Sequence, residues 1–536
     1  MSVTTRSGTG RAAPSGDDRD QAAPSPRRRP SVDRRSALTA ATVLAVALGA
    51  AARFSARGTL WLDEAISVDI SRLPVGQIGG ALRQDGHPPL YYLLLHAWTG
   101  LFGTSALAVR SLSGIISLAM LPLIWAAGRR LGGRRTAAVA TVLLATSPFS
   151  VRYATETRMY ALCGLLALAG LLAVLRATER PTPGRLVLVA AVAGATVLTH
   201  YWGIWLVGAA VISLLARAWR RPDGRRTDAK VLAALVVGSM AFVPWLSTAA
   251  FQAQHTGTPW ARSVEPLDAV FDTLLDLGGG KWVGGRLLGP LLGLLVLLAL
   301  VAVPMERWRL AVDLRTVPGA RRELAVAGAT MLLGLGAAVA ASSAYQPRYA
   351  AGVVPLVLLA AAVGVDRLPN STLRIAVVAV VAVVGLAGSW RATQEPRTQA
   401  GEIAAVLAEH AAPGDVVAYC PDQLRPAVQR ELDLRGAPSL QAITLPGGSP
   451  AGRVDWVDYR KRIRAEDPVA LAARAVRLAG PDGTVWLVSS PSYRGFGDSC
   501  EQVQAALADA RGAVQPTVRR DTDSYERAGL RRYPPR

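Results

Sequence analysis

The sequence predicts an α-helical protein that crosses a membrane many times and carries a small C-terminal α/β domain. The chain of 536 residues is 51% hydrophobic, with a mean hydropathy of +0.28, and its first 390 residues contain eleven long apolar runs. From about residue 390 the composition changes to that of a soluble domain. We therefore expect a tail over residues 1–35, a membrane domain over 36–390 and an α/β domain over 391–536.

The N-terminal tail and the first apolar run have different predicted roles. The tail is rich in Pro, Ser, Gly and Arg and lacks apolar periodicity, which predicts disorder. The run that begins at Ala37 resembles a secretory signal, because a basic stretch precedes it. Since its charged flank is long and many apolar runs follow, we interpret it as an uncleaved first span.

Ten further apolar runs predict ten more transmembrane helices. Most of them approach the roughly 20 residues that a helix needs to cross the hydrocarbon core, and the shortest would need tilt or interfacial ends. The runs cover residues 105–127, 136–151, 159–176, 186–199, 203–219, 230–247, 287–304, 324–341, 350–365 and 375–389.

The segment "PPLYYLLLHAWTGLFG", residues 88–103, decides the sidedness of the chain, because a span here would exchange the sides of all later loops. When the segment lies on the surface, the loops of one side hold twenty Lys and Arg residues and those of the other side hold six. The positive-inside rule then predicts an interfacial or re-entrant helix, a cytoplasmic N-terminus and an extracytoplasmic C-terminal domain at the plasma membrane.

The charge composition argues against nucleic-acid binding. The formal net charge is +21, but nearly all of the cations are Arg, and Lys occurs only at positions 230, 281 and 461. This skew, together with abundant Ala, Gly and Pro, indicates genomic base composition rather than a binding surface. The chain also lacks a Gly-rich phosphate loop between a strand and a helix, so use of a nucleotide sugar is not expected.

The C-terminal domain shows alternating strand and helix patterns. "PGDVVAYC" and "DGTVWLVSS" predict short buried strands, whereas "EIAAVLAEHA" and "CEQVQAALADARG" have helical periodicity. Cys420 and Cys500 both fall on the oxidising side, so a disulfide and two unpaired thiols both remain open. Cys163 lies in a predicted membrane helix, and no Cys/His cluster has the spacing of a zinc site.

Short motifs rich in acidic, basic and aromatic residues converge on the outer face. They are "WLDEAIS" (61–67), "DGHPPLYYLL" (85–94), "RYATETRMYAL" (152–162) and "YQPRYAAGVVPLVLLA" (345–360), with "THYWG" (199–203) as a weaker fifth. In order and sidedness this set resembles the polyprenyl-phosphate-sugar glycosyltransferases of the GT-C fold, and most of all the protein O-mannosyltransferase and aminoarabinose transferase group. The resemblance covers residues 37–390 and implies a GT-C-like membrane domain.

The resemblance implies roles for the acidic pair and for two arginines. Asp63 would take the proton from the acceptor hydroxyl, and Glu64 would shape the site or bind the acceptor. The phosphate leaving group needs cationic donors, with Arg348 as the first candidate and Arg158 as the second. A structural interpretation stays open for each, because an acidic pair can cap an interfacial helix and an Arg such as Arg152 can snorkel.

Four further residues complete the predicted site. Glu156 could bridge to Arg158, position the sugar or help to hold a divalent cation, Mg²⁺ or Mn²⁺; no other cofactor is expected. His87 could hydrogen-bond a substrate or mark a turn before two prolines. His200 resembles an interfacial aromatic belt as much as a sugar-stacking platform. Tyr349, next to Arg348, is grouped with the substrate-binding residues.

The predicted function is transfer of a sugar, with inversion, from a polyprenyl-phosphate donor to an extracytoplasmic glycan, lipid or protein. Mannose is the sugar that the resemblance favours, and arabinose or another pentose is the rival. The alternatives are a transporter or lipid flippase and a noncatalytic cell-envelope assembly factor. A transporter should concentrate its polar residues near the bilayer midplane, whereas the motifs here lie at outer helix ends.

Overall fold

The computed structural model describes residues 34–256, 265–305, 310–313, 320–491, 493, 495–512 and 514–535. The predicted disordered tail therefore lies almost entirely outside the described residues. The chain divides into two units, Met1–Ala41 and Thr42–Arg536, and the second contains every helix and strand after the first helix. Only the first predicted span, on α1 (Arg34–Ala52), bridges the two units.

Each of the eleven predicted spans falls on a helix. Among the described residues, eight helices, or runs of adjoining helices, are long and apolar enough to cross a membrane, and one of them, α5, covers two predicted spans. Two shorter apolar helices, α8 (Pro183–Thr199) and α15 (Val354–Asp366), supply the remaining two. The other spans lie on α7 (Tyr160–Glu179), α9 (Trp202–Arg220), α10 (Arg225–Ser239) with η2 (Met240–Trp245) and α11 (Leu246–His255), α13 (Val283–Val301), α14 (Arg321–Ala340) and α16 (Ser371–Gln394).

The long helix α5 (Ala106–Thr146) is a pair of helices joined by a sharp break. Gly133 has φ 82° and ψ −164° there, a backbone conformation that residues other than glycine rarely adopt. A Cβ on Gly128 would lie 2.7 Å from the Cα of Ala137, so the two halves pack backbone to backbone. The predicted cytoplasmic loop 128–135 is therefore a tight reversal.

Three helices follow α1 and precede α5: α2 (Leu62–Arg72), α3 (Val75–Asp85) and α4 (Leu90–Phe102). The first turn of α2 carries Asp63 and Glu64, where negative charge complements the helix dipole. Gly86, with φ 98°, ends α3, and two prolines then lead into α4. With 13 residues, α4 extends only about 20 Å. Its length fits the predicted interfacial or re-entrant segment.

The C-terminal domain contains one five-stranded sheet in the order β4-β3-β5-β7-β6. β4 (Gln441–Thr444), β3 (Val416–Cys420) and β5 (Val485–Ser489) are parallel, whereas β7 (Gly529–Tyr533) and β6 (Gln515–Val518) add antiparallel strands. The two predicted strands coincide with β3 and β5.

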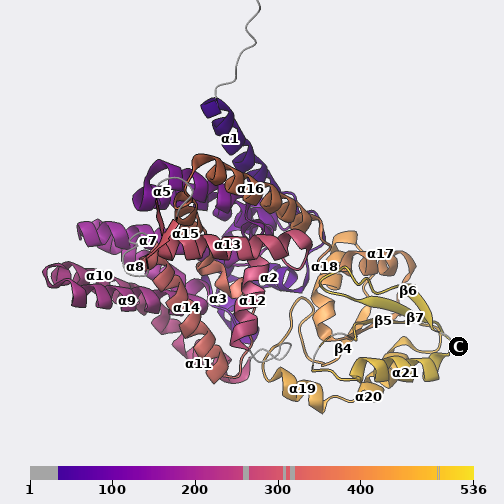
Figure 1. Cartoon of the computed structure of the whole chain (residues 1–536). Helices are drawn as coiled ribbons and strands as arrows, with labels where there is room; N and C mark the ends of the chain where they lie inside the picture. The colour runs from indigo at the N-terminus through magenta and orange to yellow at the C-terminus, as the bar shows by residue number, and fades with distance from the viewer. Residues whose placement is uncertain are drawn as a thin grey trace, which may run out of the picture. The chain divides into compact units, whose positions relative to one another are not determined.

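Helices cover both faces of this sheet (Figure 1). Val417 and Tyr419 of β3 pack in one hydrophobic cluster with residues of α17 (Ala400–His410) and α18 (Arg425–Arg435). Their neighbours on β3 pack with α20 (Pro468–Ala479) and α21 (Ser499–Arg511). Cys420 and Cys500 form a disulfide that joins β3 to α21, whereas Cys163 is a free thiol in α7.

The C-terminal domain contacts the helices that follow α1. The amide of Trp456 donates to the Gln84 carbonyl at 3.2 Å, and Arg453 pairs with Asp69 of α2 at 3.1 Å. Arg397, which precedes α17, donates to the Thr155 carbonyl at 2.7 Å. These contacts place both regions on one side of the membrane helices, in agreement with the predicted common sidedness.

Candidate functional site

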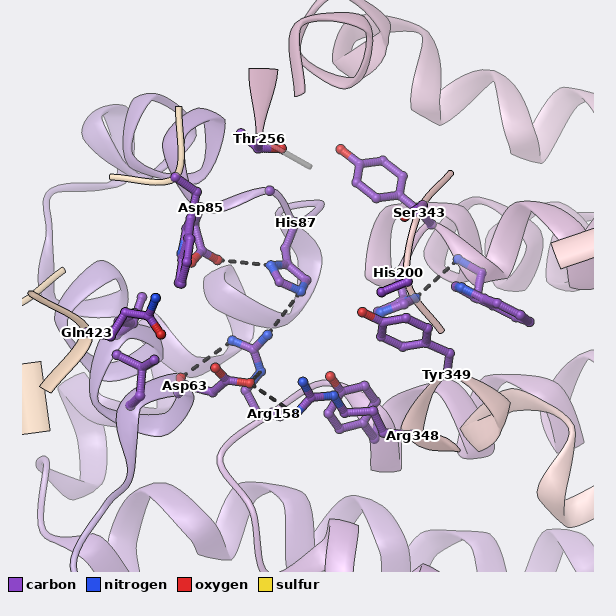
Figure 2. Close-up of a pocket in the computed structure, with 18 of the residues that line it drawn as sticks. Asp63, Asp85, His87, Arg158, His200, Thr256, Ser343, Arg348, Tyr349 and Gln423 are labelled. Atoms are coloured by element: carbon purple, nitrogen blue, oxygen red, sulfur yellow. Dashed lines mark hydrogen bonds and ion pairs between the residues drawn. The ribbon is translucent and has the colours of Figure 1, made fainter. Parts of the chain in front are cut away.

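A cavity of about 630 Å³ lies between the membrane domain and the C-terminal domain. Six of the eight predicted site residues line it: Asp63, His87, Arg158, His200, Arg348 and Tyr349. They come from α2, the α3–α4 corner, the turn before α7, the turn between α8 and α9, and η3 (Pro347–Gly352). The structure thus brings together residues that are far apart in the sequence, such as Asp63 and Arg348, which 285 positions separate (Figure 2).

Asp63 lies between two guanidinium groups at the cavity wall. Its Oδ2 atom is 3.4 Å from Nη1 of Arg348 and 3.9 Å from Nε of Arg158 (Figure 2). The Asp63 side chain remains 20% exposed, so a ligand in the cavity can reach it. A carboxylate flanked by two fixed cations suits a site that must also hold an anion.

Arg158 is held in place by three side chains. Its Nη1 donates to Oγ of Ser67 at 3.0 Å and to the Tyr92 hydroxyl at 3.2 Å, and its Nη2 lies 3.0 Å from Nε2 of His87. Since a guanidinium can only donate, Nε2 of His87 must accept this bond. The His87 proton is then on Nδ1, which donates to Asp85 at 3.0 Å. Asp85, His87 and Arg158 are therefore linked in series by hydrogen bonds, and the series ends at the ion pair of Arg158 with Asp63.

Glu64 does not line the cavity. It is fully buried beneath the cavity floor, where Nε and Nη2 of Arg110 donate to its two oxygens at 2.8 and 2.6 Å. The amide of Thr157 donates to the same carboxylate at 3.0 Å. Burial alone would raise the pKa of Glu64, but the Arg110 ion pair and these hydrogen bonds lower it to about 2. The carboxylate ties the start of α2 to the 155–158 turn.

Glu156 is also buried behind the cavity wall. Its nearest described cation is Arg152, whose Nε lies 3.9 Å from its Oε2 atom, and burial raises the pKa of the carboxyl group. Among the described residues no group of three or more His, Cys, Asp or Glu side chains could hold a metal ion. Two arginines flank the Asp63 carboxylate and would repel a cation. The site residues therefore do not fit the predicted divalent cation.

Aromatic residues form the wall opposite His87. The His200 ring lies 5.4 Å from that of Tyr349 and 6.0 Å from that of Tyr160, measured between centroids. Nδ1 of His200 accepts the amide of Trp202 at 3.1 Å, which fixes the ring orientation. Burial, helped by the nearby His87, lowers the pKa of His200 well below its usual range, so the ring is neutral.

Two smaller apolar cavities extend from this wall between the membrane helices. The first shares Tyr160, His200, Arg348 and Tyr349 with the main cavity and continues to Thr196 and Leu206. The second shares Thr196 and Leu206 with the first and is lined mostly by aliphatic residues of α7, α8 and α9, together with Arg322 and Glu323 of α14. Shared lining residues therefore place mostly apolar cavities next to Arg348 and between the membrane helices.

The sequence reasoning missed several cavity residues. Asp85 and Tyr160 lie inside quoted motifs but were not selected, although both are polar residues of those outer stretches. Seven more come from the C-terminal domain: Gln423, Trp456, Ser490, Tyr493, Tyr525, Glu526 and Arg527. No local pattern marks them, because they lie in separate connections of an α/β domain.

Comparisons with known proteins agree with this fold. Residues 86–247 match the family described as dolichyl-phosphate-mannose-protein mannosyltransferase, a stretch that contains His87, Glu156, Arg158 and His200. Among curated proteins, none matches the chain in sequence.

Several solved structures have a similar fold. ArnT from Cupriavidus metallidurans in the apo state is 17% identical with a TM-score of 0.59, covering 93% of this chain and 98% of that chain. ArnT bound to undecaprenyl phosphate is 16% identical with a TM-score of 0.57 and the same coverage. The arabinofuranosyltransferase AftD from Mycobacteria is 16% identical with a TM-score of 0.53, covering 93% of this chain and 40% of that chain.

The resemblance in sequence is confined to residues 37–390. The structural similarity to ArnT extends beyond them, because it covers 93% of the chain. The predicted fold class, a GT-C-like helical membrane domain followed by a small α/β domain, is confirmed. The apolar helices and the similar solved structures together show a multi-pass membrane protein with a GT-C-like fold.

Proposed function

We propose that the protein transfers a sugar from a polyprenyl-phosphate donor to an acceptor hydroxyl on the outer side of the plasma membrane. The observation that carries this proposal is the position of Asp63 beside Arg348, at the point where the main cavity meets apolar space between the helices. Such a place suits a ligand that has a charged head and a hydrocarbon tail. ArnT, a structure of the same fold, binds undecaprenyl phosphate.

In this mechanism Asp63 takes the proton of the acceptor hydroxyl as its oxygen attacks the anomeric carbon. The bond between that carbon and the phosphate oxygen breaks, and its electron pair leaves with the phosphate. Arg348 and Arg158 stabilise the negative charge of the departing group. One displacement inverts the anomeric configuration.

The Asp63–Arg348 ion pair gives this mechanism an order of events. While Arg348 pairs with Asp63, its guanidinium occupies the carboxylate oxygen that would accept the proton. A donor phosphate competes for Arg348 and releases the carboxylate for the acceptor proton. Donor binding therefore activates the base.

The sugar we propose is mannose, with arabinose or another pentose as the rival. The family matched over residues 86–247 is named for mannosyl transfer, whereas AftD is named for arabinofuranosyl transfer. A transporter remains the alternative from another class. The charged cavity residues Asp63, Arg158 and Arg348 lie in turns or at helix ends, which favours a headgroup site over a midplane transport site.

The test is turnover by purified full-length protein in lipid nanodiscs, with decaprenyl-phosphate mannose and decaprenyl-phosphate arabinose as separate donors. Mass spectrometry should detect transfer from one donor, and Asp63→Asn should abolish it. Asp482→Asn, an exposed carboxylate in a turn of the C-terminal domain, is the matched control. Absence of transfer from either donor, together with movement of a lipid-linked sugar across the bilayer, would identify a transporter instead.

A further inference from the structure

The C-terminal domain builds one wall of the cavity from the ends of neighbouring parallel strands. Gln423 follows the carboxyl end of β3, and Ser490 follows that of β5, the adjacent strand. In sheets with parallel strands, this edge is where ligands bind. Glu526 reaches the same cavity from the segment before β7.

Glu526 is fixed by its neighbours close to Asp63. Its amide donates to the Arg397 carbonyl at 2.8 Å, and its Oε1 atom accepts the Tyr493 hydroxyl at 3.1 Å. Burial raises the pKa of this carboxyl group to about 7, although hydrogen bonds from Thr398, Tyr493 and the Leu62 amide oppose the shift. A second carboxyl group thus lies in the cavity, beside the residue that immediately precedes Asp63.

Two polar atoms on uncharged side chains of the cavity wall have no hydrogen-bond partner among the residues that the structure describes. They are Oγ of Ser490, a residue that is 1% exposed, and Nε1 of Trp61, which is 5% exposed. Buried polar groups in folded proteins are nearly always satisfied, so an unmatched pair in a cavity indicates a polar ligand.

The two walls of the cavity have different surroundings. Arg348, Tyr349 and His200 also line the apolar space between the membrane helices, which suits the lipid donor. Gln423, Ser490 and Glu526 line the main cavity alone and belong to the domain outside the helices. Figure 2 shows Gln423 and Tyr349 on opposite sides of Asp63. The acceptor is therefore expected on the side of the C-terminal domain.

We propose that the C-terminal domain is the acceptor-binding element and that its acceptor is a carbohydrate, whose hydroxyl groups are held by Ser490 and Glu526 beside Asp63. This inference rests on the proposed function and adds the substrate class of its second ligand. Sugar hydroxyls both donate and accept hydrogen bonds, which matches a carboxyl group, an amide and a hydroxyl on one wall. Trp456 and Tyr525 supply aromatic faces there for the apolar side of a sugar ring.

A protein acceptor fits this wall less well. Extended peptides commonly pair with an exposed edge strand through their main chain. The wall here comes from side chains at the ends of β3 and β5, which are internal strands of the sheet. A peptide acceptor that offers a single serine or threonine hydroxyl would also leave most polar groups of the wall without a hydrogen-bond partner.

The test is equilibrium dialysis of the full-length protein in detergent with radiolabelled mannobiose and, separately, arabinobiose. Wild-type protein should bind one of them, and Ser490→Ala and Glu526→Gln should each weaken binding by at least about tenfold. Glu409→Gln, an exposed carboxylate of the same domain, should bind as wild type does. Ser490→Ala should fold normally, because it removes no hydrogen bond that the structure contains.

Failure of the carbohydrate-acceptor proposal can be distinguished from failure of the proposed transfer reaction. Arg348→Lys should weaken use of the lipid donor and leave disaccharide binding unchanged. Disaccharide binding without turnover would refute the transfer reaction and keep the binding site. Binding of neither disaccharide, equal binding by Ser490→Ala and Glu526→Gln, or transfer to a Thr-rich peptide alone would overturn the carbohydrate acceptor.

Discussion

The carboxylate of Asp63 and the guanidinium of Arg348 meet at 3.4 Å although 285 positions separate them in the chain. The first residue stands in the opening turn of α2 and the second in η3, just before α15. In the proposed mechanism, this ion pair joins the two functions that transfer from a lipid-linked sugar requires, proton removal and phosphate binding. It also makes each function testable by a single substitution.

Replacement of Asp63 by Asn should remove the base and preserve the shape of the site. Turnover should fall by at least about 10²-fold, which is typical of the loss of a general base. Donor affinity should be retained or improved, because Arg348 loses the partner that competes with phosphate. Steady-state transfer and donor binding, measured on the same preparation, check both outcomes. Near-normal turnover would remove Asp63 from the mechanism, and a product that retains the donor's configuration would refute the single displacement.

Replacement of Arg348 by Lys should impair the enzyme although it preserves the charge. A guanidinium can bind two phosphate oxygens in a planar fork, whereas an ammonium is a point charge. Loss of one charge-assisted bond, worth about 1.5 to 3 kcal/mol, should weaken donor use by about 10 to 150-fold. Donor titration of the transfer reaction measures this effect, with Arg57→Lys, an exposed residue, as control. An unchanged response to donor would assign Arg348 a structural role.

Much of the membrane domain could be predicted from the sequence because lipid imposes long apolar runs with charged ends. The same rule places the motifs on one face, and the resemblance to the GT-C glycosyltransferases then points within them to Asp63, His87, Arg158, His200, Arg348 and Tyr349. Glu64 could not be separated from Asp63 in this way. Adjacent helical residues point in different directions, and only the packing of Arg110 beneath α2 shows which carboxylate is buried.

The contribution of the C-terminal domain could not be predicted. Two long-range contacts bring this domain to the cavity. The parallel pairing of β3 and β5 places Gln423 and Ser490 there, and the hydrogen bond from the Glu526 amide to the Arg397 carbonyl holds the segment before β7 beside it. These pairings join residues that are far apart in sequence, and periodicity carries no information about them. For the same reason the sequence leaves open whether Cys420 and Cys500 form a disulfide or remain two free thiols. Their proximity follows from the packing of α21 on the sheet.

The predicted sidedness can be tested by labelling of single cysteines in intact cells. In a Cys163→Ala background, Pro450→Cys should react with a membrane-impermeant maleimide, because the C-terminal domain is expected outside. Gly224→Cys, in the Arg-rich loop before α10, should react only after the membrane is permeabilised. The reverse pattern would overturn the whole arrangement, including an extracytoplasmic active site.

The buried Glu64–Arg110 pair predicts a pH-dependent contribution to stability. Glu64→Gln leaves the Arg110 guanidinium with an uncompensated charge, so the free energy of unfolding should fall by about 3 to 5 kcal/mol. Glu179→Gln breaks an exposed pair with Arg130 and should cost less than about 1 kcal/mol. Chemical unfolding of both variants in detergent, followed by fluorescence, provides the comparison.

The sign of the pH effect follows from the depressed pKa of Glu64. The folded protein holds this pKa at about 2, whereas the ordinary value is 4.5. The unfolded chain therefore takes up the proton first as the pH falls, and the stabilisation is complete above about pH 4.5 and disappears towards pH 2. Because Gln does not titrate, the difference in unfolding free energy between wild type and Glu64→Gln should be constant from pH 7 to pH 5 and should shrink below that range. A difference that stays constant down to pH 3 would show that Glu64 gains nothing from its charge, and the link between α2 and the 155–158 turn would then depend on packing alone.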